Sequence, residues 1–186
     1  MKSLKLILKQ FAIVFIAVFL NLAINPTLLS AQSAINEESR IGNAVIAHFE
    51  GSLIDLSKDW GEARACWSDG EIAECFRTES HMDEFVSEKV LVSVTTSTCP
   101  TAVKLYSNTS YSGSVLSLVL RAATINLNAY GFDNLTSSYV IGACDATFYD
   151  FANLGTPTYP GSTTANSSAA SMLTGWDNRV SSIYIS

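Results

Sequence analysis

The sequence is poor in the residues that most enzymes use for catalysis. Only two of its 186 residues are histidines, His48 and His81, and both precede residue 99. A catalytic site needs a nucleophile, a base near its working pH and a group that orients them. Neighbouring carboxylates such as Asp83 and Glu84 are adjacent along the chain, which is typical of a solvated helix face and not of a cleft. We therefore expect no enzymatic activity.

Basic residues are also scarce, with 11 Lys and Arg against 17 Asp and Glu. A chain this acidic is a poor partner for nucleic acid or for an anionic membrane. The acidity is uneven, because residues 35–98 hold 13 acids and five bases whereas residues 99–186 hold four acids and three bases. The two regions are therefore expected to be different kinds of segment, an acidic lead-in segment (35–98) and a domain (99–186).

The longest apolar run is short, covering residues 11–20 after three lysines. A membrane-spanning helix needs about 20 predominantly apolar residues, and Asn21 and Pro26 interrupt this run. An order of basic, apolar and small residues is typical of a secretory signal peptide. We expect residues 1–34 to be such a peptide, cleaved after Ala31 or Ser33, so that the mature protein is secreted and has no membrane attachment.

Cysteines are few, and no Cys-x-x-Cys pair of the kind that binds metal through thiolates is present. The four cysteines, Cys66, Cys75, Cys99 and Cys144, would meet an oxidising compartment after export. Three pairings are possible. We favour Cys66 with Cys75, because they flank a turn at residues 69–70, and Cys99 with Cys144, because they bracket one repeat unit.

The lead-in segment is expected to hold a helix and then a hairpin. Ile41, Val45, Phe49 and Leu53 recur every four positions, which predicts a helix within residues 37–56. Residues 63–67 and 72–76 are typical of a short hairpin. Its two cysteines can lie directly opposite each other only if the loop covers four residues, 69–72, and not a tight two-residue turn.

A second helix is expected between this hairpin and residue 90. Thr78 is suited to cap it, with acidic residues in its first turns near the positive end of the helix dipole. Met82, Phe85 and Val86 would face inward, and the helix would run to about Lys89.

From residue 99 onward the composition is that of an all-β domain, rich in Ser, Thr, Gly, Tyr and alternating apolar residues. The octet GFDNLTSS at residues 131–138 returns 44 residues later as GWDNRVSS at residues 175–182, with five identical positions. Upstream, Leu105-Tyr106 has a counterpart in Phe148-Tyr149. The simplest explanation is two copies of one supersecondary unit.

The first unit resembles a known family. Tyr106, Tyr111 and Gly113 resemble the folded-hairpin signature of βγ-crystallin Greek keys, and each octet is similar to that family's calcium motif. Glycine permits a positive φ where the hairpin folds over. The expected fold class is therefore α+β: a small helical and hairpin N-terminal segment, followed by the all-β βγ-crystallin-like double Greek-key sandwich that the resemblance implies.

The octets offer hard oxygen ligands suited to calcium. The residues expected to bind it are Asp133, Asn134 and Ser137 in the first octet and Asp177, Asn178 and Ser181 in the second. The resemblance implies two sites, each combining one octet with a backbone carbonyl and residues of the opposite unit. We assign Ser138 and Ser182 to structure. With one carboxylate per site, affinity should be weak, with a Kd of about 10⁻⁴ to 10⁻³ M. The alternative is that these residues are only turn formers.

The second unit departs from the family pattern after Tyr149. Its aromatic-x-Gly element falls either at residues 154–156, Leu-Gly-Thr, or later at residues 159–161, Tyr-Pro-Gly, if several residues are inserted. The shape of the second hairpin stays open on the sequence alone.

The mature chain, including residues 66–79 and Ser171-Met172-Leu173, also looks like secreted proteins grouped with the small metalloproteinase inhibitors of actinomycetes. That resemblance implies an extracellular protease as partner, although no inhibitory residue can be matched. The expected function is binding, by a monomeric secreted calcium-binding protein that inhibits a peptidase. The alternative is a non-inhibitory extracellular structural or cell-envelope protein that uses calcium only for stability.

Overall fold

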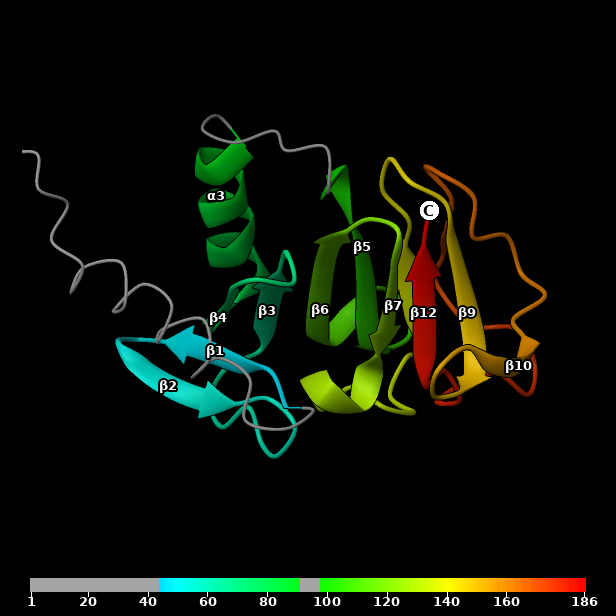
Figure 1. Cartoon of the computed structure of the whole chain (residues 1–186), viewed down its shortest axis with the longest axis horizontal. Coiled ribbons are helices and arrows are strands. Elements are labelled where there is room, and N and C mark those ends of the chain that lie inside the picture. The colour runs from blue at the N-terminus through cyan, green and yellow to red at the C-terminus, as the bar shows by residue number, and fades with distance from the viewer. Residues whose placement is uncertain (1–43, 91–97) are drawn as a thin grey trace, which may run out of the picture. The chain divides into compact units, whose positions relative to one another are not determined.

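The computed structural model describes residues 44–90 and 98–186 of the chain (Figure 1). The expected signal peptide lies outside the described residues, as do residues 37–43 of the expected first helix. Across the part that is described, no helix is long and apolar enough to cross a membrane.

Two β-sheets form the framework of the described structure. The strands of the larger sheet are β1 Ile46–Phe49, β2 Ser52–Asp55, β3 Ala65–Ser68, β4 Ala73–Phe76, β5 Thr98–Asn108, β6 Ser112–Leu120, β8 Ser138–Val140 and β11 Ser168–Ala169. The strands of the smaller sheet are β7 Ala123–Asn126, β9 Ala146–Phe151, β10 Gly155–Thr158 and β12 Ser182–Ile185. The helical elements are α3 Glu79–Val90 and the short 3-10 helix η1 Leu127–Tyr130.

The strand order shows two interlocked Greek-key units. The larger sheet runs β11-β8-β5-β6-β3-β4-β1-β2 and the smaller sheet runs β10-β9-β12-β7. The first unit is β5 to β8 and the second is β9 to β12, and each gives its third strand to the other unit's sheet. Thus β7 pairs with β12, and β11 pairs with β8. Fully buried side chains that include Leu105, Leu116, Phe148 and Ile183 form one core with residues of both sheets.

The lead-in segment extends the first Greek-key sheet. Strand β3 pairs in parallel with β6, so that Cys66 lies beside Leu116, and β4, β1 and β2 follow it outward (Figure 1). Cys66 and Cys75 are directly opposite across β3 and β4, and the connecting loop covers residues 69–72. Both expected disulfides, Cys66–Cys75 and Cys99–Cys144, are confirmed, and no described cysteine is free.

The helix expected within residues 37–56 is wrong over its described part. Residues 46–55 form the hairpin of β1 and β2, joined by a two-residue loop in which Glu50 has φ 49° and Gly51 has φ 80°. Positive φ at both loop residues matches the twist of a two-residue hairpin. Leu53 pairs with His48, on the opposite face from Phe49, and its side chain is 63% exposed. The four-residue spacing therefore came from two strands and not from one helical face.

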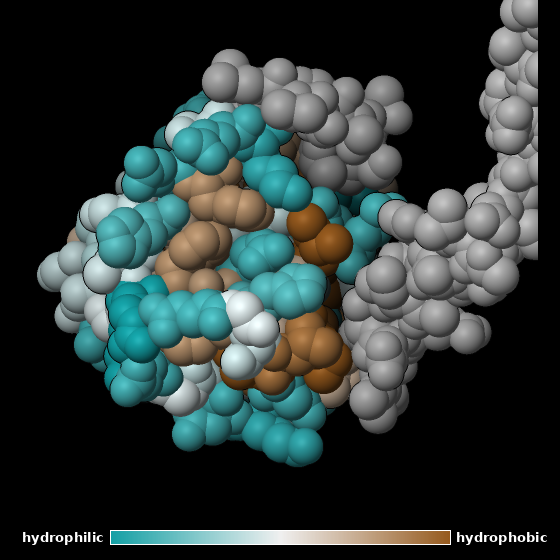
Figure 2. Space-filling view, turned by 90° about the vertical axis from the view of Figure 1, so that its left-hand side faces the viewer, coloured by the Kyte–Doolittle hydropathy of each residue, from teal (hydrophilic) through white to brown (hydrophobic). Residues whose placement is uncertain are grey.

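The expected second helix is present as α3, on the outer face of the larger sheet. His81 donates its backbone N–H to Thr78 Oγ1 at 3.3 Å at the first turn. Met82 is fully buried, and Phe85 packs edge-on against Trp67 of β3 with ring centroids 5.7 Å apart. Figure 2 faces the side of α3 and β1–β2 and shows hydrophobic residues in the middle of a mainly hydrophilic surface.

Candidate metal sites at the crossing of the two octets

The two octets have the same local conformation. Each begins with a glycine in the left-handed region, Gly131 at φ 62° and Gly175 at φ 82°, and each carries a left-handed asparagine, Asn134 at φ 54° and Asn178 at φ 56°. In both, the aromatic second residue is buried, the next three residues are exposed and the last three are buried. The repeat in sequence is therefore also a repeat in backbone and burial.

Backbone hydrogen bonds join the two octets directly. Asn134 donates its N–H to the carbonyl of Val180 at 3.0 Å, and Asn178 donates its N–H to the carbonyl of Thr136 at 3.0 Å. This reciprocal pair of hydrogen bonds places each asparagine beside the end of the opposite octet.

Side-chain hydrogen bonds also join each octet to the other. Ser137 Oγ donates to Asn178 Oδ1 at 3.1 Å, and Ser181 Oγ donates to Asn134 Oδ1 at 3.3 Å. Each expected ligand serine thus meets the asparagine of the other octet. We call the pair Asn134 and Ser181 the first site and the pair Asn178 and Ser137 the second site.

The spacing of these oxygens suits a calcium ion. Two adjacent ligand oxygens, each about 2.4 Å from the same Ca²⁺, lie about 3 Å apart. The hydroxyl and amide oxygens of each site already have that separation, so they fit as neighbours in one coordination shell.

The carboxylates of the octets lie at the surface. Asp133 and Asp177 are both exposed, and Asn134 Nδ2 donates to Asp133 Oδ2 at 3.2 Å. Among the residues that the structure describes, no three His, Cys, Asp or Glu side chains gather into one group. A donor set of one carboxylate with hydroxyl, amide and carbonyl oxygens is suited to a hard cation such as Ca²⁺ and poorly suited to zinc.

The serines that end the octets hold the folded hairpin of their own unit. Ser138 Oγ donates to the carbonyl of Asn108 at 2.6 Å and accepts the N–H of Tyr111 at 3.1 Å. In the second unit Ser182 Oγ donates to the carbonyl of Phe151 at 2.6 Å and accepts the N–H of Leu154 at 3.0 Å. Their hydroxyls are therefore engaged in bracing the fold.

In the first hairpin, the expected signature residues lie together. The rings of Tyr106 and Tyr111 meet edge-on with centroids 5.8 Å apart. Gly113 has φ 82°, and a Cβ there would lie 2.3 Å from Ser107 Oγ. Both the backbone angle and the available space therefore call for glycine at this position.

In the second hairpin, the bond from Leu154 to Ser182 decides between the two alternatives. Leu154, at φ 61°, takes the place of Tyr111, and Thr156 takes the place of Gly113. Tyr159 is instead a core residue, 7% exposed, packed against Tyr139, Phe148 and Trp176. No extra residues precede the second hairpin, and the departure from the family pattern is one of side chains.

Two residues that were not predicted to be functional, Asp150 and Trp60, hold the octets from outside. Arg179 makes two bonds to the Asp150 carboxylate, at 2.8 and 2.6 Å, and stacks on the ring of Trp176. The hydrogen bond from Arg179 lowers the pKa of Asp150 below its usual value. On the other side, Trp60 Nε1 donates to the carbonyl of Tyr130 at 2.9 Å. No sequence signal marks Asp150 or Trp60, since neither belongs to the repeated pattern.

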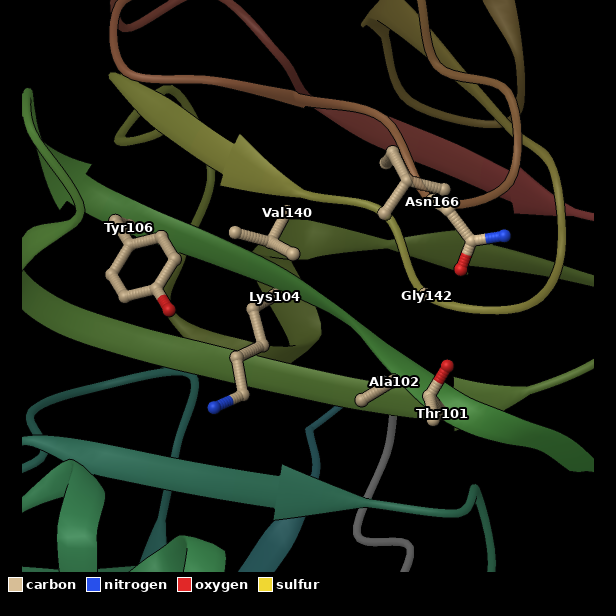
Figure 3. Close-up of a pocket in the computed structure, with 8 residues that line it drawn as sticks. Thr101, Ala102, Lys104, Tyr106, Val140, Gly142 and Asn166 are labelled. Carbon is tan, nitrogen blue, oxygen red and sulfur yellow. The ribbon is translucent and has the colours of Figure 1, made fainter.

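A groove of about 480 Å³ lies on the outer face of β5 and β8, and none of its lining residues belongs to an octet (Figure 3). Lys104 and Tyr106 line it, and both are held by α3: Lys104 Nζ lies 2.8 Å from Glu79 and 2.7 Å from Asp83, and Tyr106 donates to Glu79 at 2.7 Å. Burial alone would lower the pKa of Lys104, but the bonds to the two carboxylates outweigh it and raise that pKa. The positive charge of Lys104 in the groove is therefore already balanced by the carboxylates of Glu79 and Asp83.

No family model and no curated protein matches this sequence. Solved structures that resemble it include βγ-crystallin domains. One is a βγ-crystallin from Ciona intestinalis, with 19% identity and a TM-score of 0.40 over 46% of this chain and 99% of that chain. A domain from Flavobacterium johnsoniae has 28% identity and a TM-score of 0.37 over 45% and 92%, and one from Clostridium beijerinckii has 20% and 0.36 over 45% and 95%. None of these comparisons addresses secretion or protease inhibition, which stay predictions.

Proposed function

We propose that this is an exported, non-enzymatic calcium-binding protein with two sites, one at each crossing of the octets. The observation that carries the proposal is the pair of hydroxyl–amide contacts, Ser181 with Asn134 and Ser137 with Asn178, at 3.3 and 3.1 Å. Asp133 and Asp177 would each add one carboxylate. The two cysteine pairs, both bonded, fit a protein that works outside the cell.

An ion at either crossing would link the two Greek-key units. Each site takes its asparagine from one octet and its serine from the other, so ligands that are 47 residues apart at the first site and 41 residues apart at the second would share one ion. The ion would bind the folded domain and not the unfolded chain, because unfolding separates the octets. Each occupied site should therefore raise the free energy of unfolding by about 2.7 kcal/mol at a calcium concentration 100-fold above its Kd.

The same geometry favours calcium over magnesium. Calcium accepts six to eight oxygens in flexible arrangements, whereas magnesium demands a tight octahedral shell and gives up its waters reluctantly. A loop of hydroxyl, amide and carbonyl oxygens with one carboxylate supplies the first arrangement and not the second.

The proposal is tested by thermal unfolding of the mature protein in millimolar calcium, in millimolar magnesium and in chelator. We expect the midpoint to rise in calcium and to rise much less in magnesium. If calcium and chelator give the same midpoint, the octets are turn formers and the proposed function is wrong.

Alanine variants of neighbouring serines provide matched controls. Ser137→Ala and Ser181→Ala should each weaken one site, and together they should abolish the calcium-dependent shift with little change in the midpoint measured in chelator. Ser138→Ala and Ser182→Ala, one residue along, should lower the midpoint equally in calcium and in chelator, because these serines brace the hairpins.

A further inference from the structure

The lead-in segment contacts the start of the first octet. Val45 donates its N–H to the carbonyl of Ala129 at 3.0 Å, just before that octet. A Cβ placed on Gly131 would lie 2.1 Å from the carbonyl oxygen of Leu56, so the lead-in backbone occupies the space that a side chain would need. The two segments are packed as closely as backbones allow at this point.

Trp60 reinforces this contact with a buried side chain. Its Nε1 donates to the carbonyl of Tyr130 at 2.9 Å, and its ring lies 5.6 Å from the ring of Phe132, centroid to centroid. Trp60 is 9% exposed and Phe132 is 1% exposed. Since Phe132 directly precedes Asp133 and Asn134, the lead-in segment fixes the chain immediately before two expected calcium ligands.

Among the described residues, the start of the second octet has no such contact with the lead-in segment. A Cβ on Gly175, the counterpart of Gly131, would meet no atom of residues 44–90 or 98–186 within 4 Å, apart from those of its own residue and its two chain neighbours. This octet is held from within the Greek-key domain, where Arg179 bonds to Asp150 and to the carbonyl of Gly175 at 3.2 Å. The two octets are alike in backbone but are supported by different parts of the chain.

We propose that the lead-in segment, acting through Trp60 and the backbone at Leu56, is a positioning element for the first calcium site and is coupled to that site alone. The inference rests on the proposed calcium binding. A loop already held in its bound conformation loses less conformational freedom when it binds, so the lead-in contact favours binding at the first site. Coupling is reciprocal, and calcium at the first site must therefore stabilise the docked lead-in by the same factor.

Hydrogen exchange of the full mature chain tests this coupling without altering the lead-in. Ser137→Ala retains the first site, and Ser181→Ala retains the second. In Ser137→Ala, calcium should slow exchange in the peptide that covers residues 44–56 by about fivefold or more, because Val45 and Leu56 lie in the contact. In Ser181→Ala, calcium should leave exchange in that peptide unchanged.

The two octet glycines offer a matched pair of variants. Gly131→Ala and Gly175→Ala both place alanine at a positive φ, but only the first also forces the lead-in backbone away. Measured by calorimetric calcium titration in the Ser137→Ala background, Gly131→Ala should weaken the first site by about fivefold or more. Gly175→Ala should leave the Kd of the first site unchanged. If Gly131→Ala does not fold, Trp60→Phe removes the bond to Tyr130 while keeping a ring, and it should weaken the first site in the same direction.

The outcomes separate the two claims. The inference is overturned if calcium binds but leaves hydrogen exchange in residues 44–56 unchanged. It is also overturned if calcium slows that exchange equally in Ser137→Ala and in Ser181→Ala. In both cases the proposed function stands. If the wild-type protein shows neither a calcium titration nor a calcium-dependent midpoint, the proposed function fails and this inference fails with it.

Discussion

The two Greek-key units differ most in their folded hairpins. The first has the tyrosine pair Tyr106 and Tyr111 with Gly113 at φ 82°, whereas the second has Leu154 and Thr156 in the places of Tyr111 and Gly113. Both hairpins nevertheless fold over, and both are held by a buried serine from the end of their own octet. The serine and the backbone bonds around it therefore define this hairpin, while Tyr111 and Gly113 fill it in the first unit and Leu154 and Thr156 fill it in the second.

The largest effect should come from equivalent core residues of the two units. Leu105 and Phe148 occupy matching positions in β5 and β9, and both are fully buried. Truncation to alanine should cost about 2–5 kcal/mol for Leu105 and about 3–5 kcal/mol for Phe148. Urea unfolding measures both losses. A large loss at only one position would break the equivalence of the two units.

The bracing serines should give the next largest effect. Ser138→Ala and Ser182→Ala each remove a buried hydroxyl that makes two bonds to a hairpin backbone, at a cost of about 1–3 kcal/mol. We expect similar losses in the two units, measured by urea unfolding in chelator. If Ser182→Ala left the free energy of unfolding unchanged while Ser138→Ala lowered it, the second hairpin would be held by its own residues. The conclusion that the serine defines both hairpins would then be wrong.

The hairpin positions themselves should behave differently in the two units. Gly113→Ala puts a side chain at φ 82°, and we expect it to cost about 1–3 kcal/mol. Thr156 is not among the described residues with positive φ, so Thr156→Gly should cost only about 0.5–1 kcal/mol, through backbone entropy. Thermal unfolding in chelator compares the two. Equal losses would mean that the second hairpin needs Thr156 as strictly as the first needs Gly113.

The smallest effect should be an acid sensitivity confined to the second unit. Asp150 stands where the first unit has Ser107, and its bond with Arg179 lowers its pKa from the usual 3.8. The bond between Asp150 and Arg179 should stabilise the fold fully above pH 3.8, the usual pKa of the carboxyl. This stabilisation should be lost as the pH falls further, through the lowered pKa of Asp150. Arg179 is 44% exposed, which keeps this contribution small. Acid unfolding of Asp150→Asn should therefore be slightly less steep than that of wild type, and an identical acid profile would contradict this assignment.

The sequence was most informative where residues repeat. The two octets share five of eight positions, and that recurrence predicted two equivalent units and two equivalent loops before any contact was known. Both disulfides could also be predicted, because a turn lies between Cys66 and Cys75 and a repeat unit lies between Cys99 and Cys144. Residues at equivalent places in repeated units face equivalent surroundings, so their roles transfer from one unit to the other.

The sequence was misleading in the lead-in segment, which has no internal copy. Val45, Phe49 and Leu53 are spaced as on one helical face, yet a loop at Glu50 and Gly51 reverses the chain between them. The Gly51 position was a turn signal that the apolar spacing outweighed. In so short a segment, periodicity cannot separate one helix from two four-residue strands.

The sequence by itself determined the repeated units and the oxygen-rich loops, because each depends on residue types within one short segment or on its copy, and it favoured the observed cysteine pairing among the three possible ones. Only the tertiary structure decided that Ser137 faces Asn178 and Ser181 faces Asn134, that β3 joins the edge of β6, and that Trp60 meets Phe132. These contacts join residues from about 40 to more than 70 positions apart. These contacts depend on how the sheets pack and on which strand edges remain available for pairing. A local pattern of side chains in the sequence does not predict either.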